Sequence, residues 1–345
     1  MTSRTPDVSA QTGEVAWLKR LMPYRRSNGW RGTFELAVTL VPFVALWLLS
    51  WFLVANGNWW GVVFTVPAAG FLLRLFMIQH DCGHGAFFGK RQIDDWLGRA
   101  IGVLTLTPYD CWRRTHAIHH ASSGNLDARG IGDVRTLTVA EYRALGAWGR
   151  VGYWLYRHPA VMFGLGPVYL FLLQHRLPVG AMRVGPLPWV STMGTNVAIT
   201  ALVVGLIWLV GIVPFLLVHL PIVVMAGTAG VWLFYVQHQF EETHWSQKPE
   251  WAFETAALHG SSFYDLPKPL HWITANIGIH HVHHISSRVP YYRLPQVLRD
   301  FPELKSIGRI SIPESIRGVK LVLWDETQRR LISFREARML KRAAA

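Results

Sequence analysis

Residues 59–84 read WWGVVFTVPAAGFLLRLFMIQHDCGH, an apolar run that ends in a pair of histidines. The apolar part, residues 59–78, is close to the roughly 20 residues that a helix needs to cross the hydrocarbon core of a bilayer. His80 and His84 follow at a spacing that places both imidazoles on one face if the backbone is helical. This stretch therefore predicts a membrane-spanning helix that delivers two candidate metal ligands to one side of the membrane.

The rest of the chain supports a membrane protein. Hydrophobic residues make up 51% of the 345 residues, 17 are tryptophan, and the mean hydropathy is +0.21, which is too apolar for an ordinary soluble domain. Three further runs are long enough to span: residues 33–55, 193–211 and 214–236. Only short turns separate the members of each pair. We expect an all-α integral membrane protein with four transmembrane helices in two hairpins.

The distribution of lysine and arginine predicts the orientation. The turns at residues 55–58 and around Ile212 carry no basic residue, and Arg74 is the one basic residue inside a span, where snorkelling would accommodate it. The positive-inside rule then places both termini and all histidine motifs in the cytoplasm, in a multi-pass protein expected in a bacterial inner membrane. The expected segments are a cytoplasmic arm (1–32), a first hairpin (33–78), a cytoplasmic part (79–192), a second hairpin (193–236) and a cytoplasmic tail (237–345).

Charge and cysteine content narrow the chemistry. The net charge of +13 is explained by basic flanks on an anionic membrane leaflet, so no nucleic-acid partner is expected. The N-terminus is polar and does not resemble a cleavable signal peptide. The two cysteines, Cys82 and Cys111, are expected on the reducing side, which leaves neither a disulfide framework nor a cysteine metal site.

Two more histidine windows follow the first. Residues 116–120 read HAIHH and residues 280–284 read HHVHH, while His238 stands just beyond the fourth expected span. Eight or nine imidazoles suit two metal ions that keep open positions better than one structural zinc. Imidazole without thiolate is compatible with iron, copper, nickel or zinc, so ligand type alone leaves the metal open.

The residues in and around these three histidine motifs resemble those of a known family. HDCGHGAFF (80–88), TPYDCWRRTHAIHH (107–120) and NIGIHHVHH (276–284), followed by PYYRLP (290–295), are similar to the three histidine boxes of the membrane fatty acid desaturase superfamily. The similarity is greatest to bacterial and plant-type acyl-lipid desaturases. It implies two iron ions, dioxygen as co-substrate, electrons from an external donor such as a ferredoxin, and a lipid acyl chain that acquires a cis double bond.

The resemblance also assigns the ligands position by position. His238 resembles an extra histidine that completes the iron set in this family. His281 falls between box positions and is expected beside the ligands or on the surface, and Asn276, one helical turn before His280, is a candidate to hold a metal-bound water. The box ligands implied are His80, His84, His116, His119, His120, His280, His283 and His284.

Other functions stay open at this stage. A lipid or carotenoid hydroxylase or ketolase of the same superfamily would use similar histidines. A histidine-rich membrane metal transporter would also be polytopic, although its ligands should lie near the membrane midplane, whereas these windows lie outside the expected spans.

Several smaller expectations concern the surroundings of the site. Short apolar runs at 97–108 and 160–173 are expected at the membrane interface, and residues 316–340 are expected to form a surface helix. Nearby acids should accept the second N–H of liganding histidines. The candidate acids are Asp81, Asp110, Asp127, Asp133, Glu241 and Glu242, and the histidines expected to play no part in metal binding are His158, His175, His219, His244, His259 and His271.

Overall fold

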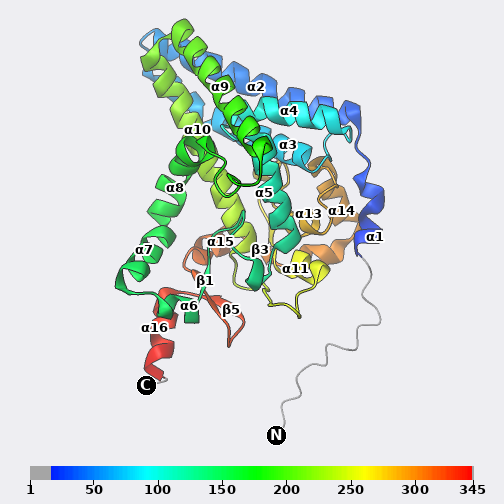
Figure 1. The fold of residues 1–345 in the computed structure, drawn as a ribbon. Helices are drawn as coiled ribbons and strands as arrows, with labels where there is room; N and C mark the ends of the chain where they lie inside the picture. The colour runs from blue at the N-terminus through cyan, green and yellow to red at the C-terminus, as the bar shows by residue number, and fades with distance from the viewer. Residues whose placement is uncertain (1–16, 344–345) are drawn as a thin grey trace.

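The computed structural model describes residues 17–343, so residues 1–16 of the expected N-terminal arm lie outside the described residues. The described chain is mostly helical (Figure 1). Four of its helical segments are long and apolar enough to cross a membrane. Within the described residues, two short elements precede them, α1 (Trp17–Leu21) and the 3-10 helix η2 (Met22–Arg25).

The four membrane-length segments coincide with the four predicted spans. They are α2 (Gly29–Ala55), the 3-10 helix η3 (Trp59–Phe64) continued by α3 (Thr65–Gly83), α9 (Pro186–Val210) and α10 (Ile212–His238). Helices α9 and α10 run side by side (Figure 1), and α3 is the most buried of the set because it packs against α2, α10 and α4. Helix α10 is longer than expected, so His238 is its last residue and does not stand beyond it.

Arg74 differs from the sequence expectation. Its side chain is only 1% exposed and forms an ion pair with Glu35 of α2, so it does not snorkel. Arg74 also donates to Thr39 Oγ1 at 3.1 Å and to the backbone carbonyl of Trp272. A buried charge is tolerated when it is paired and hydrogen-bonded, and here both conditions hold.

The segment between α3 and α9 is a series of shorter helices. The expected interfacial run 97–108 forms the end of α4 and the turn after it, where Leu106 has a positive φ of 55°. The second run, 160–173, is helical with two π-helical stretches. The elements are α4 (Arg91–Leu104), α5 (Tyr109–Ser122), η4 (Leu126–Ala128), β1 (Leu137–Thr138), α6 (Val139–Ala144), α7 (Ala147–Arg157), η5 (Val161–Leu165), α8 (Gly166–Val168), η6 (Tyr169–Leu173) and η7 (Gln174–Arg176).

The segment after α10 mixes short helices with strands. Its elements are α11 (Phe253–His259), β2 (Phe263–Tyr264), α12 (Lys268–Ile273), α13 (His280–Ile285), η8 (Tyr291–Arg293), α14 (Leu294–Asp300), η9 (Pro302–Ser306), β3 (Arg309–Ile310), α15 (Ile312–Gly318), β4 (Leu323–Asp325), β5 (Arg330–Ile332) and α16 (Phe334–Ala343).

The short strands correct two expectations. The fold is not strictly all-α, because β1 pairs in parallel with β4, β4 pairs antiparallel with β5, and β2 pairs in parallel with β3. The tail at 316–340 is not one surface helix either. Its strands β4 and β5 bury the consecutive pairs Leu323 and Trp324, and Leu331 and Ile332, and helix is confined to the two ends of this tail, in α15 and α16.

Candidate metal centre

All nine histidines predicted as ligands lie together. They come from four elements: the end of α3, helix α5, the last residue of α10 and helix α13. Their ligand atoms form two groups, and within each group these atoms lie within 4.8 Å of one another. The first group is His80, His84, His116, His120 and His283, and the second is His119, His238, His280 and His284.

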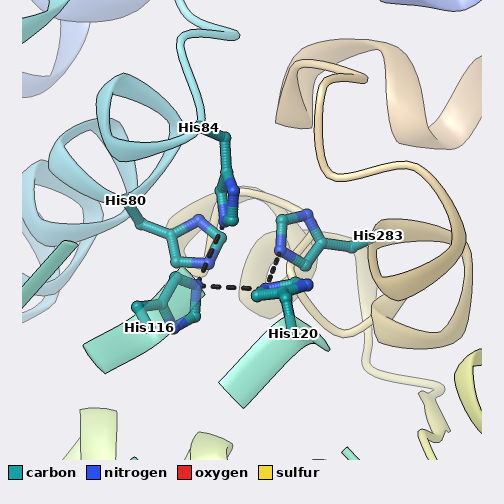
Figure 2. A group of neighbouring side chains, drawn as sticks. All are labelled: His80, His84, His116, His120 and His283. Carbon is teal, nitrogen blue, oxygen red and sulfur yellow. Dashed lines mark hydrogen bonds between the residues drawn. The ribbon is translucent and has the colours of Figure 1, made fainter. Parts of the chain in front are cut away.

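The first group joins all three sequence motifs. Figure 2 shows its five rings facing a common centre from α3, α5 and α13. The Nε2 atoms of His84 and His116 are 3.1 Å apart, and those of His116 and His120 are also 3.1 Å apart. His283 Nε2 lies 3.2 Å from His120 Nε2. The motifs therefore form one site and not three separate ones.

The second group contains the histidine at the end of α10. His238 Nε2 lies 3.1 Å from His119 Nε2 and 3.1 Å from His280 Nε2, and His284 Nε2 lies 3.0 Å from His280 Nε2. All four residues are buried. The position of His238 at the helix terminus thus brings its ring to the same point as the second and third motifs.

Helix geometry explains why each motif is divided between the groups. Residues four apart on an α-helix differ by about 40° around the axis, whereas residues three apart differ by about 60° in the opposite sense. In α5, His116 and His120 share one face and His119 projects to the other side. In α13 the assignment to the groups is reversed: the two histidines four residues apart, His280 and His284, belong to the second group, and His283 belongs to the first.

The two groups are adjacent. The rings of His120 and His284, one from each group, stack with their centroids 4.1 Å apart. Trp112 covers the first group by stacking on His116 at 4.6 Å. Burial, with a smaller contribution from neighbouring imidazoles, lowers the pKa well below its usual value for His84, His116, His120, His280, His283 and His284. Neutral imidazole is the form that binds metal ions.

Hydrogen bonds orient three of the nine rings. His119 Nδ1 donates to Asp133, His80 Nδ1 lies 3.4 Å from Asp81 Oδ1, and His238 Nδ1 donates to the Gly260 carbonyl at 3.3 Å. In a neutral imidazole with Nδ1 protonated, Nε2 carries the lone pair. The Nε2 lone pairs of His119 and His238 therefore face each other with no proton between them, an arrangement that a bound cation would stabilise.

Only two of the six candidate acids contact these histidines. Asp110 pairs with Arg99 and Arg113, and Asp127 accepts the backbone N–H of Lys248 at 2.9 Å. Glu241 and Glu242 are exposed. Asp81 and Asp133 are therefore the carboxylates that orient ring nitrogens in the described part of the chain.

Of the two less certain candidates, one is buried in the ligand helix α13 and the other lies in a turn before it. His281 belongs to neither group. It is fully buried, and its Nε2 donates to the Leu304 carbonyl at 2.9 Å, so it is not a surface residue. Asn276 lies in a turn with a positive φ of 56° and not in a helix leading to His280. The six histidines expected to play no part in metal binding also lie outside both groups, within residues 17–343.

Comparison with known proteins identifies a family. A family model described as "Fatty acid desaturase" matches residues 57–308. A "Fatty acid desaturase" of Bacillus subtilis (strain 168) is 42% identical over 318 residues, which cover 92% of this chain and 90% of that protein. An "sn-1 acyl-lipid omega-3 desaturase (ferredoxin)" of Synechocystis is 30% identical over 282 residues, covering 76% and 72%.

A plant protein is also similar. The "Omega-3 fatty acid desaturase, endoplasmic reticulum" of Vigna radiata is 27% identical over 315 residues, covering 85% of this chain and 75% of that protein. The family model matches most of the chain, and the Bacillus protein is similar over nearly all of it, so the class of protein is defined. The chain belongs to the fatty acid desaturase family, a family of oxidoreductases.

Proposed function

We propose that this protein introduces a cis double bond into the fatty acyl chain of a membrane lipid, using two iron ions held by the nine histidines. The observation that carries the proposal is the meeting of nine imidazoles from three motifs and α10 in two adjacent, buried groups. The similarity to an acyl-lipid desaturase supports a lipid-linked substrate.

The donor set fits metal ions with more than four ligands. Five imidazoles in the first group exceed the four of a tetrahedral zinc site. At a metal–nitrogen distance of about 2.1 Å, ligands at a right angle are separated by roughly 3.0 Å, and tetrahedral ligands by roughly 3.4 Å. The Nε2 atoms of His84 and His116, and of His280 and His284, are 3.1 and 3.0 Å apart, nearer the first value, and those of His120 and His283, 3.2 Å apart, lie midway. Imidazole is a common ligand of iron.

Iron, when bound, would supply the redox chemistry by which dioxygen takes two hydrogens from adjacent methylenes and, with two electrons from an external donor and two protons from solvent, is reduced to two water molecules. The residues of the chain hold and orient the site. Asp133 and Asp81 fix the ring nitrogens of His119 and His80, and Trp112 stacks on the ring of His116. A ferredoxin is the proposed electron donor, since one similar protein carries that word in its name.

The proposed placement has the four membrane-length helices spanning a bacterial inner membrane as two hairpins, with both termini and the metal centre in the cytoplasm. The absence of basic residues from the turns at 55–58 and around Ile212 supports this orientation. The segments 79–192 and 237–345 then form the cytoplasmic parts that enclose the histidines.

Lipid analysis tests the function. Expression of the chain should produce acyl chains with a new double bond, whose position mass spectrometry can locate. His84→Ala, His119→Ala and His283→Ala should each abolish the product and lower bound iron while the protein remains in the membrane. A hydroxylated or keto product would favour the alternative oxygenase chemistry, and metal uptake without lipid oxidation would favour a transporter.

A further inference from the structure

An apolar cavity lies among α9, α10 and the helical segment at 169–176, apart from both histidine groups. Its volume is about 200 Å³. A cavity of about 150 Å³ lined by Leu, Ile and Phe can stay dry and bind an apolar ligand, so this one is large enough to hold part of a hydrocarbon chain. The apolar walls include Phe171, Leu172, Ile199, Val203, Phe215 and Val223.

One wall of the cavity carries a cation. Arg176 donates from Nη1 to Asn196 Oδ1 at 2.8 Å and from Nη2 to the Leu106 carbonyl, and both acceptors are uncharged. Among residues 17–343, no carboxylate lies within ion-pair distance of Arg176. Its Nε is buried and has no hydrogen-bond partner. The guanidinium charge is therefore uncompensated within the described chain.

The level of Arg176 suits an anionic lipid. The proposed second hairpin begins at residue 193, so Asn196 lies about 5 Å inside the cytoplasmic end of its span. Its partner Arg176 then lies at the cytoplasmic leaflet, where anionic head groups gather. A cation beside apolar walls is normally paired, so an anion is the missing partner.

A second polar group borders the same cavity. His219 of α10 is 9% exposed, stacks on Phe215 with ring centroids 5.1 Å apart, and has an Nδ1 without a hydrogen-bond partner. A buried ring nitrogen in this state is unfavourable unless a ligand satisfies it. Arg176 and His219 thus provide two polar contacts on an otherwise hydrocarbon-lined site that lies between membrane-length helices.

We propose that this cavity binds an anionic lipid, whose charged group pairs with Arg176 and contacts His219 and whose hydrocarbon chain fills the apolar part. The anion is a carboxylate or a phosphate on an acyl chain, supplied by a fatty acid or a phospholipid. This inference rests on the membrane placement proposed above but not on the desaturation chemistry, because no histidine of the two metal groups lines the cavity.

Native mass spectrometry of the full-length protein in a neutral detergent tests the proposal. The delipidated protein is incubated separately with phosphatidylglycerol, with palmitate, and with the uncharged analogues diacylglycerol and methyl palmitate. At least one anionic lipid should be retained, on the order of tenfold more than its uncharged analogue. Retention of phosphatidylglycerol would identify a phosphate as the anion, and retention of palmitate a carboxylate. Equal retention of the charged and uncharged forms would overturn the proposal.

Variants locate the site. Arg176→Gln should reduce retention about tenfold, Arg176→Lys should restore most of it, and Val203→Trp should exclude the chain by filling the cavity. The matched control is Arg183→Gln, which removes an exposed arginine between η7 and α9 and should bind like the wild type. Bound iron serves as the folding readout and should stay unchanged in all four variants. Wild-type retention in Arg176→Gln with normal iron would refute the site without affecting the proposed desaturase function.

Discussion

Tyr291 donates its backbone N–H to the carboxylate of Asp81 at 2.7 Å, which ties the segment after the third histidine motif to the first motif. The hydroxyl of Tyr291 donates to Glu35 Oε2 at 3.1 Å, and Glu35 is paired with Arg74. A single buried polar network therefore connects α2, α3 and the segment that follows α13. It reaches the metal centre through Asp81, whose carboxylate lies beside the ring of His80.

This network predicts a large stability effect at Arg74. Arg74→Met should destabilise the protein by about 3 kcal/mol, because the buried carboxylate of Glu35 then keeps only the half-exposed Arg31 as a cationic partner. The double variant Arg74→Met/Glu35→Met should lose less than the sum of the two single variants. Thermal unfolding in detergent, followed by circular dichroism, measures both effects. Additive losses would show that the two side chains do not act as a pair.

The sequence was informative where the physical signal is local. Four apolar runs of membrane length predicted the spans, and helical spacing predicted that His116 and His120 share a face. The sequence could not predict the ion pair between Glu35 and Arg74, because these two residues are 39 positions apart and lie on different helices. One acidic and one basic residue in neighbouring apolar runs are the only signal that the sequence carries for this ion pair.

The tail and the acids show a similar limit. Alternation of apolar and basic residues at 316–340 is compatible with an amphipathic surface helix and with strands. Whether short strands such as β4 and β5 form depends on the strands with which they pair. The sequence alone does not distinguish which of the acids near the motifs contacts a histidine. Asp133 contacts His119 and Asp127 does not, because the loop after α5 turns one toward the ring and the other toward residue 248.

Asp133 offers a matched test of ring orientation. Asp133→Asn should lower activity or iron affinity about 10- to 100-fold, because the carboxylate that holds His119 Nδ1 is lost. Asp127→Asn, in the same loop, is the control and should leave bound iron unchanged. Metal analysis of the purified variants distinguishes the two. Iron loss of equal size in both would indicate a general disturbance of the loop.

The metal-free protein should lose stability in acid. Burial holds the pKa well below the usual value for six ligand histidines, so the unfolded chain binds more protons below about pH 6.5. These six are His84, His116, His120, His280, His283 and His284. Stability should be greatest above that pH and fall as the pH decreases, by up to about 1.4 kcal/mol per pH unit for each histidine. Melting temperatures of the metal-free protein from pH 8 to 5 measure this slope. A flat profile would contradict the buried, neutral state of the rings.

Thiol labelling tests the orientation in the membrane. In a variant that lacks Cys82 and Cys111, cysteines introduced at Asn56 or Ile212 should react with a membrane-impermeant reagent added outside intact cells. Cysteines at Ser122 or Ser287 should react only after the cells are opened, because these positions flank the histidine helices α5 and α13. The reverse pattern would place the metal centre on the outer side.

His238 gives the sharpest test of the two-group arrangement. It contributes one of four imidazoles to the second group and none to the first, whose five histidines should still bind a metal ion without it. His238→Ala should therefore eliminate desaturation and reduce bound iron to about half, since catalysis needs both ions and only one loses a ligand. His158→Ala, which removes an exposed histidine outside both groups, is the control and should retain full iron and product. Iron quantification per folded protein, alongside analysis of the lipid product, distinguishes the possible outcomes. Full iron and normal product in His238→Ala would remove His238 from the site, and complete loss of iron would show that the two groups bind metal as a single cooperative unit.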